Sequence, residues 1–142
     1  MLRFLQKRKF RLVTRWKSAL KENIGFQLPL QHDFPYALIF RAFDDVIRQL
    51  KSGSIGDRFE VAESLLAEVP EADSPTADQY MELFLTGRDI LGDFVDSDKA
   101  FCGIYDAADR QELRSDLEQV FKHLIDREMR EHVRRNAPTV RR

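Results

Sequence analysis

The sequence predicts an all-α protein, folded as a single compact domain of five or six helices. Its 142 residues match the length of one ordinary domain. Six glycines and five prolines are too few for a fold dense in strands and turns, and apolar residues recur at helical spacing along most of the chain. We expect the helical domain to occupy residues 1–135 and residues 136–142 to form a disordered basic tail.

The first predicted helix begins at Leu2 and ends near Gly25, a residue type that commonly stops helices. With about 100° of rotation per residue, its apolar side chains form one stripe and its basic side chains fill the opposite side. Phe4 and Phe10 fall outside the stripe, on opposite flanks. Two such aromatics on a basic helix indicate a second contact surface, and we expect this helix, through both rings, and the last helix of the chain to be elements of a homodimer interface. The stripe consists of Leu2, Leu5, Leu12, Val13, Trp16, Ala19 and Leu20.

Two further helices are expected in the next third of the chain. Asp33 can accept hydrogen bonds from first-turn amides and Pro35 fits the first turn, so a helix begins here and buries one apolar face over 36–50. Gly-Ser-Ile-Gly at 53–56 ends it, and this turn lacks the Lys-Ser or Lys-Thr pair of a phosphate-binding loop. A capping-box pattern then opens a short helix over 57–66.

The fourth predicted helix is the most buried one. Thr76 and Gln79 have the spacing of a capping box, which places the helix start just before residue 77. From 77 to 95 the apolar arc covers more than half of the circumference, as is typical of a central helix. Gly87 lies on the apolar side, and without a Cβ it lets a neighbouring helix approach closely.

The C-terminal part is predicted to form a short turn and a long helix. Residues 96–105 are expected to form a loop or a short helical turn. The last helix begins after Asp106 and runs to about Arg135, and Pro138 marks the disordered end. Its apolar side chains in register are Leu113, Leu117, Val120, Phe121, Leu124 and Ile125.

Arg88 breaks the pattern of the fourth helix. It projects about 40° from Phe84, inside the apolar arc, where a guanidinium needs a carboxylate or several carbonyls. Two interpretations remain open. Arg88 either forms an intramolecular salt bridge or extends to the rim, or it contacts an anion or acidic ligand in a pocket between helices.

Residues with catalytic or metal-binding chemistry are few and scattered. His32, His123 and His132 lack the i, i+4 spacing of a helical ligand pair, and the fourth helix has no histidine for a haem pocket. Cys102 has no histidine nearby in sequence and is interpreted as a small buried hydrophobe. The acidic side chains follow exposed faces rather than a shared cleft. We therefore expect no catalytic residue, no cofactor and no metal, and the protein is predicted not to be an enzyme.

Charge is distributed unevenly although the net charge is −1. Residues 1–22 carry eight Lys or Arg against one acid, and residues 57–98 carry twelve Asp or Glu against two arginines. These regions can attract each other within one fold or across two copies. The basic first helix also suits nucleic acid or an anionic lipid surface, which is the alternative function. A pI near 6.3 and the lack of an evident helix-turn-helix pair make nucleic acid the less favoured partner.

The sequence also predicts in which cellular compartment the protein is found. The longest purely apolar run, 36–40, is far shorter than the ~20 residues that a membrane span needs. The single cysteine suits a reducing environment. We therefore expect a cytoplasmic protein with no transmembrane segment.

Two segments resemble a known family. Residues 5–16, LQKRKFRLVTRW, form a charged helix with a Trp near its end, and residues 34–53 read FPYALIFRAFDDVIRQLKSG, with a Ser-Gly stop. Both are similar to the N-terminal sensor domain of the RsbR and RsbRD stressosome regulators. The helix over 77–95 and the last helix fit the rest of that pattern, so the resemblance covers about residues 1–135.

The resemblance implies a globin-like helical bundle without haem, usually dimeric, that acts as a sensory or protein-interaction module. In that family the module precedes a STAS domain that passes the output toward a switch kinase, and no STAS segment follows within the 142 residues. What carries over is therefore a dimeric signalling module that binds an unidentified protein partner or a small ligand. The sigma-factor pathway stays open, and the family has no motif from which binding residues can be transferred.

Overall fold

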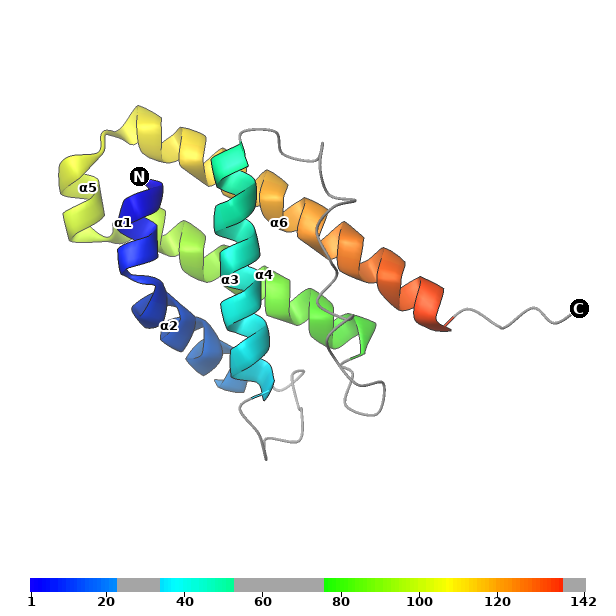
Figure 1. Ribbon diagram of the computed structural model, residues 1–142. Helices are drawn as coiled ribbons and strands as arrows, with labels where there is room; N and C mark the ends of the chain where they lie inside the picture. Colours follow the sequence, from blue (N-terminus) through cyan, green and yellow to red (C-terminus); the bar gives the residue numbers. More distant parts are fainter. Residues whose placement is uncertain (23–33, 53–75, 137–142) are drawn as a thin grey trace, which may run out of the picture.

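The computed structural model describes residues 1–22, 34–52 and 76–136, and six helices cover nearly all of these ranges (Figure 1). No strand occurs in them, so the predicted all-α fold is confirmed. The helices are α1 (Leu2–Lys7), α2 (Lys9–Glu22), α3 (Phe34–Ser52), α4 (Ala77–Ser97), α5 (Lys99–Ile104) and α6 (Ala107–Asn136).

The predicted first helix is in fact two helices, so the expectation of one continuous helix is wrong. α1 ends at Lys7 and α2 begins at Lys9, with Arg8 between them at φ −108° and ψ 16°. The Arg8 N–H donates to the Leu5 carbonyl at 3.0 Å, which tightens the turn. The Arg8 guanidinium lies over the Phe4 ring, 3.6 Å from its centroid, so the break is associated with the position of Phe4.

The apolar stripe predicted for this region nevertheless forms the inner face of both helices. Its largest members are fully or almost fully buried, and they join one core cluster that all six described helices share. Burial of such a stripe, rather than helix propensity, provides most of the stability of short helices. The buried members are Leu5, Leu12, Val13, Trp16 and Leu20.

α3 packs against α1, α2 and α6. The apolar face predicted over 36–50 faces the core, with Ile39, Phe43 and Val46 at most 1% exposed and Phe40 and Leu50 half-buried. The helix ends at Ser52, whose Oγ donates to the Gln49 carbonyl at 2.8 Å. The predicted cap at Asp33, the turn at 53–56 and the helix over 57–66 lie outside the described residues.

α4 is the central helix, as predicted. The capping box is present, because the Gln79 N–H donates to Thr76 Oγ1 at 3.2 Å and the Thr76 N–H donates to Gln79 Oε1 at 2.8 Å. The prediction for Gly87 is confirmed as well. A Cβ at this position would lie 2.1 Å from the ring of Trp16, whose Nε1 donates to the Leu83 carbonyl at 2.8 Å. α2 thus packs directly on the α4 backbone.

A short α5 connects α4 to the long α6. The side chain of Asp98 caps α5 by accepting from the Phe101 N–H at 3.0 Å, and Asp106 caps α6 by accepting from the Asp109 N–H at 2.8 Å. α6 then runs antiparallel to α4, its most extensive neighbour, and ends within a residue of the predicted position (Figure 1). None of the described helices is long and apolar enough to cross a membrane.

Candidate functional site

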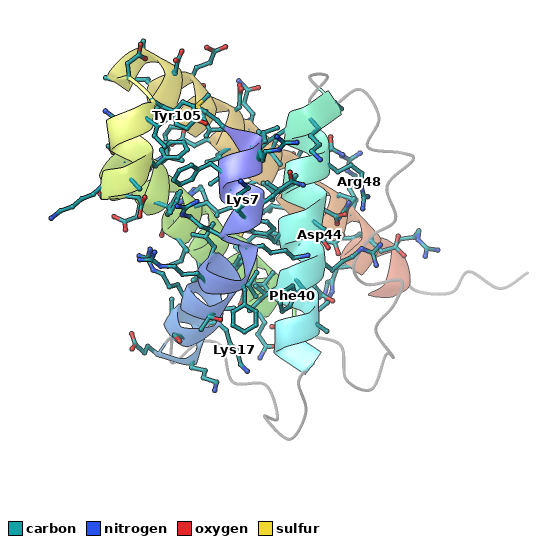
Figure 2. All side chains as sticks on the ribbon, turned by 60° about the vertical axis from the view of Figure 1, so that its left-hand side comes forward. Lys7, Lys17, Phe40, Asp44, Arg48 and Tyr105 are labelled. Carbon is teal, nitrogen blue, oxygen red and sulfur yellow. The ribbon has the colours of Figure 1, made fainter. Side chains whose placement is uncertain are left out.

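The N-terminal helices present an exposed face that carries positive charge and one aromatic ring. Phe10 is 70% exposed, more than any other large apolar residue that the structure describes. The exposed cations of the same two helices include Arg3, Lys7, Arg11 and Lys21, and Figure 2 shows Lys7 on the side where α1, α2 and α5 come forward. We refer to these four cations together with Phe10 as the basic–aromatic surface.

Other basic side chains of α2 are neutralised within the fold. Lys9 Nζ lies 2.6 Å from Asp44 Oδ1 of α3, and Arg15 Nη2 lies 3.3 Å from Asp93 Oδ2 of α4. The second pair joins the basic N-terminal region to the acidic middle region within one chain. By contrast, no ion pair involves the four cations of the basic–aromatic surface in the part of the chain that the structure describes.

The two aromatics predicted for the interface occupy different environments. Phe4 is half-buried and meets Phe94, Phe101 and Tyr105 at ring-centroid distances of 6.1, 5.3 and 6.3 Å. This aromatic cluster joins α1 to α4 and α5. Phe10 points outward, so the structure does not bring Phe4 and Phe10 together, and only Phe10 is open to a partner over most of its surface.

Arg88 is not buried in the core. Its side chain is 41% exposed, and its Nε and Nη2 lie 3.4 and 3.3 Å from Oδ1 of the adjacent Asp89. The same residue lines a groove of about 370 Å³ between α4 and α6, together with the apolar Phe121 and Ile125. Arg88 therefore has both the ion pair and the groove position that the sequence left open, and the groove's other lining residues are Glu118, Lys122 and Asp126.

A second groove, of about 530 Å³, adjoins the first at Glu118. Its central residue is Arg114, which pairs with Asp96 and lies 3.7 Å from Glu118 Oε1. The guanidinium lies over the bare backbone of Gly92, where a Cβ would be 2.6 Å from Cζ. Because Arg114 is already held by two carboxylates, this groove offers little uncompensated charge to a ligand.

Sequence reasoning missed a buried ion cluster between α3 and α6. Asp45, Arg127 and Glu128 are 2, 9 and 0% exposed. Arg127 Nη2 donates to Asp45 Oδ2 and Nε donates to Glu128 Oε2, both at 3.1 Å. Arg48 Nη1 lies 3.2 Å from Asp45 Oδ1, close enough for an ion pair but outside hydrogen-bond geometry, and Arg41 Nε lies 3.9 Å away. Nη1 of Arg127 has no hydrogen-bond partner among the described residues.

A signal for this cluster was present in the register of α6. Leu117, Val120 and Leu124 repeat every three or four residues, and the same repeat continues to Arg127 and Glu128. Charged side chains in a core register indicate a buried ionic contact when an acid or base stands opposite. The opposite residue is on α3, and sequence alone does not show which helix faces which.

The other titratable groups are dispersed. Cys102 is half-buried with Sγ 3.4 Å from the Asp96 carbonyl, and His123 and His132 are half-buried on α6. Among the described residues, no group of three His, Cys, Asp or Glu side chains is arranged to hold a metal ion. Near the end of α6, hydrogen bonding to Glu131 and its negative charge raise the pKa of Arg134.

The chain was compared with protein-family models, with curated proteins and with solved structures, and none of the three comparisons gave a match. The resemblance to stressosome sensor domains therefore stays a prediction that rests on the segments quoted above. Function is inferred from the surfaces and buried contacts of the chain itself.

Proposed function

We propose that the chain is a non-enzymatic signalling or regulatory module, a homodimeric helical domain of the haem-free globin-like kind that acts by binding other protein chains. The observation that carries this proposal is the exposure of Phe10 among cations that have no acidic partner in the described chain. Phenylalanine and arginine are enriched at protein interfaces, and lysine is depleted from interface cores but tolerated at their rims.

The fold itself does not need Phe10 to be aromatic. α2 is held to the core by four buried side chains, Leu12, Val13, Trp16 and Leu20, and Phe10 is not among them. Covering a phenylalanine side chain in an interface stabilises the complex by about 1.5–3 kcal/mol. A partner that buries Phe10 therefore gains more binding free energy than a partner that contacts only the charged side chains, since exposed ion pairs contribute about 0–1 kcal/mol each.

The test is a measurement of self-association with a matched surface control. Sedimentation velocity over a range of concentrations should show a dimer for the unmodified chain and a shift toward monomer for Phe10→Ser. Val133→Ser is the control, because Val133 is 67% exposed and lies at the other end of the molecule on α6. Circular dichroism should show unchanged helicity in both variants. A monomer at all concentrations, or equal dimerisation of Phe10→Ser and the unmodified chain, would contradict the proposal.

The alternative is binding of nucleic acid or another anionic surface by the same helices. It is supported by the four exposed cations of the basic–aromatic surface, which can follow a phosphate backbone. It is weakened by Lys9 and Arg15, whose charges are compensated by Asp44 and Asp93. Fluorescence anisotropy with labelled single- and double-stranded oligonucleotides distinguishes the two functions. Tight binding that falls steeply with salt and is lost in Lys7→Glu/Arg11→Glu would favour the alternative.

A further inference from the structure

We propose that the partner that covers Phe10 is a second copy of this chain, and that it does so with its own α5 and the start of α6. This inference rests on the proposed function, because it assigns the surface through which the proposed homodimer forms. We refer to four exposed residues at the end of α5 and the start of α6, Ile104, Asp106, Asp109 and Glu112, as the acidic surface.

The acidic surface has the same design as the basic–aromatic surface with the opposite charge. Ile104 is 62% exposed, and the three carboxylate residues that follow it in sequence are exposed. Asp106 uses one oxygen to cap α6, so Asp109 and Glu112 are the carboxylates left without a described partner. Arg110, the one cation within this stretch, donates through Nε to the Tyr105 carbonyl at 3.1 Å.

The surroundings of Ile104 leave it accessible to a partner. Gly103 precedes it, and a Cβ built there would meet nothing within 4 Å. Phe101, on the other side of α5, is fully buried and fixes the short helix against the core. The exposed residues of α5 are therefore Lys99, Ala100, Gly103 and Ile104, and the isoleucine has small neighbours at 100 and 103, so an aromatic ring can pack onto it.

The two surfaces belong to elements that meet where α1 lies beside α5. Phe4 of α1 contacts Phe101 of α5 at 5.3 Å and Tyr105 at 6.3 Å, so these two helices are neighbours. Figure 2 shows α5 beside α1, with α2 continuing from the end of α1 and with Lys7 and Tyr105 labelled. In the proposed dimer, a two-fold axis brings each patch onto the other patch of the partner. One dimer then contains two identical contacts.

Charge complementarity selects this occupant over an unrelated apolar surface. The basic–aromatic surface and the acidic surface attract each other in both contacts of such a dimer, and like-charge placements are penalised. The arrangement also accounts for two of the four exposed large hydrophobics described, Phe10 and Ile104.

The test changes the charge of each surface separately. Lys7→Glu/Arg11→Glu reduces the net charge of the basic–aromatic surface to zero, and Asp109→Lys/Glu112→Lys makes the acidic surface net positive. Each variant alone should associate at least about tenfold more weakly than the unmodified chain, because the first variant loses the attraction in both contacts and the second turns it into repulsion. Mixed in equal amounts, the two variants should form a 1:1 heterodimer whose affinity falls between about 0.05 M and about 0.5 M salt. Lys122→Glu/Arg130→Glu, on exposed positions of α6, is the control and should dimerise normally.

The outcomes separate this inference from the proposed function. Recovery of association in the mixture supports the inference and also shows that both variants are folded. If the unmodified chain and both variants dimerise equally, the dimer uses another face, and the inference is wrong while the proposed function stands. If neither variant associates and the mixture fails as well, with helicity intact, the reciprocal contact is contradicted. A monomeric unmodified chain overturns both.

Discussion

At the contact between α2 and α4, the Trp16 ring lies against the bare backbone of Gly87 and its Nε1 donates to the Leu83 carbonyl at 2.8 Å. Between α3 and α6, the contact is instead made by Asp45, Arg127 and Glu128, at most 9% exposed. The first contact satisfies its polar atom and excludes water with an apolar ring. The second removes three charges from water and leaves Arg127 Nη1 without a described partner. Apolar shape complementarity therefore stabilises one side of the core, and on the other side desolvation opposes the ionic attraction.

Because of this difference, we expect substitutions in the buried ion cluster to lower the free energy of unfolding more than any other change considered below. Arg127→Met leaves the buried carboxylates of Asp45 and Glu128 less compensated, so the free energy of unfolding should fall by about 3–5 kcal/mol. Replacing all three members, as Asp45→Leu/Arg127→Met/Glu128→Leu, should recover most of that loss. Urea denaturation measures both. Arg130→Met, at an exposed site on the same helix, is the control, and its free energy of unfolding should stay within about 0.5 kcal/mol of the unmodified chain. An equally small change for Arg127→Met would show that the fold does not need the cluster for its stability.

The Trp16–Gly87 contact should be broken by a single methyl group. In Gly87→Ala the new Cβ would overlap the indole ring, which is fully buried, and the free energy of unfolding should fall by about 3 kcal/mol. Gly103→Ala is the matched control, because Gly103 faces open space in α5 and the change should stabilise by about 0.5–1 kcal/mol. Thermal denaturation of the two variants should therefore move in opposite directions, and a shift of the same sign would contradict the packing.

The two phenylalanines of the N-terminal helices sharpen the comparison at the surface. Phe4→Ala removes a half-buried ring from the aromatic cluster with Phe94, Phe101 and Tyr105, and should cost about 2 kcal/mol of unfolding free energy. Phe10→Ala should change it by less than about 0.5 kcal/mol at concentrations where the chain is monomeric. Guanidinium denaturation distinguishes them. Equal losses would mean that Phe10 belongs to the monomer's core.

The smallest effect is expected at the start of α4. Thr76→Ala removes the capping box and should lower the unfolding free energy by about 1 kcal/mol. Thr14→Ala is the matched control, because the Thr14 hydroxyl donates within α2 to the Phe10 carbonyl and caps no helix. The free energy of unfolding of Thr14→Ala should be close to that of the unmodified chain. If both variants denature together, the cap contributes nothing to α4.

The central helix and its contact with α2 were predictable because their signals are local. Thr76 and Gln79 mark a start that depends only on neighbouring backbone groups, and the wide apolar arc leaves only a narrow polar face for solvent. The place of Gly87 on that arc predicted close approach. The helical wheel also placed Phe10 outside the buried stripe, which agrees with its 70% exposure.

The break at Arg8 and the buried ion cluster were not predictable because both depend on tertiary partners. Residues 7–10 contain no Gly or Pro that would signal a helix break. The position of Phe4 depends on its contact with Phe101 of α5, which lies beside α1. Arg127 and Glu128 continue the core register of α6, but Asp45 is 82 positions from Arg127, and sequence alone does not show that α3 faces α6. The exposure of Phe10 could be predicted from the helical periodicity of the sequence. The surface proposed to cover it could not, because that surface depends on where α5 lies in the fold.

The most direct test of the central claim, that Phe10 is covered by another protein chain, is photocrosslinking from its own position. Phe10 is replaced by benzoylphenylalanine, the purified chain is irradiated at micromolar concentration, and the products are mapped by mass spectrometry after trypsin digestion. We predict a covalent dimer in which position 10 is joined to the tryptic peptide 100–110 of the second copy, which contains Ile104. A dimer joined through a different peptide would retain the homodimer and overturn the assigned acidic surface. Irradiation that gives only monomer, from a chain that is folded by circular dichroism, would contradict the claim.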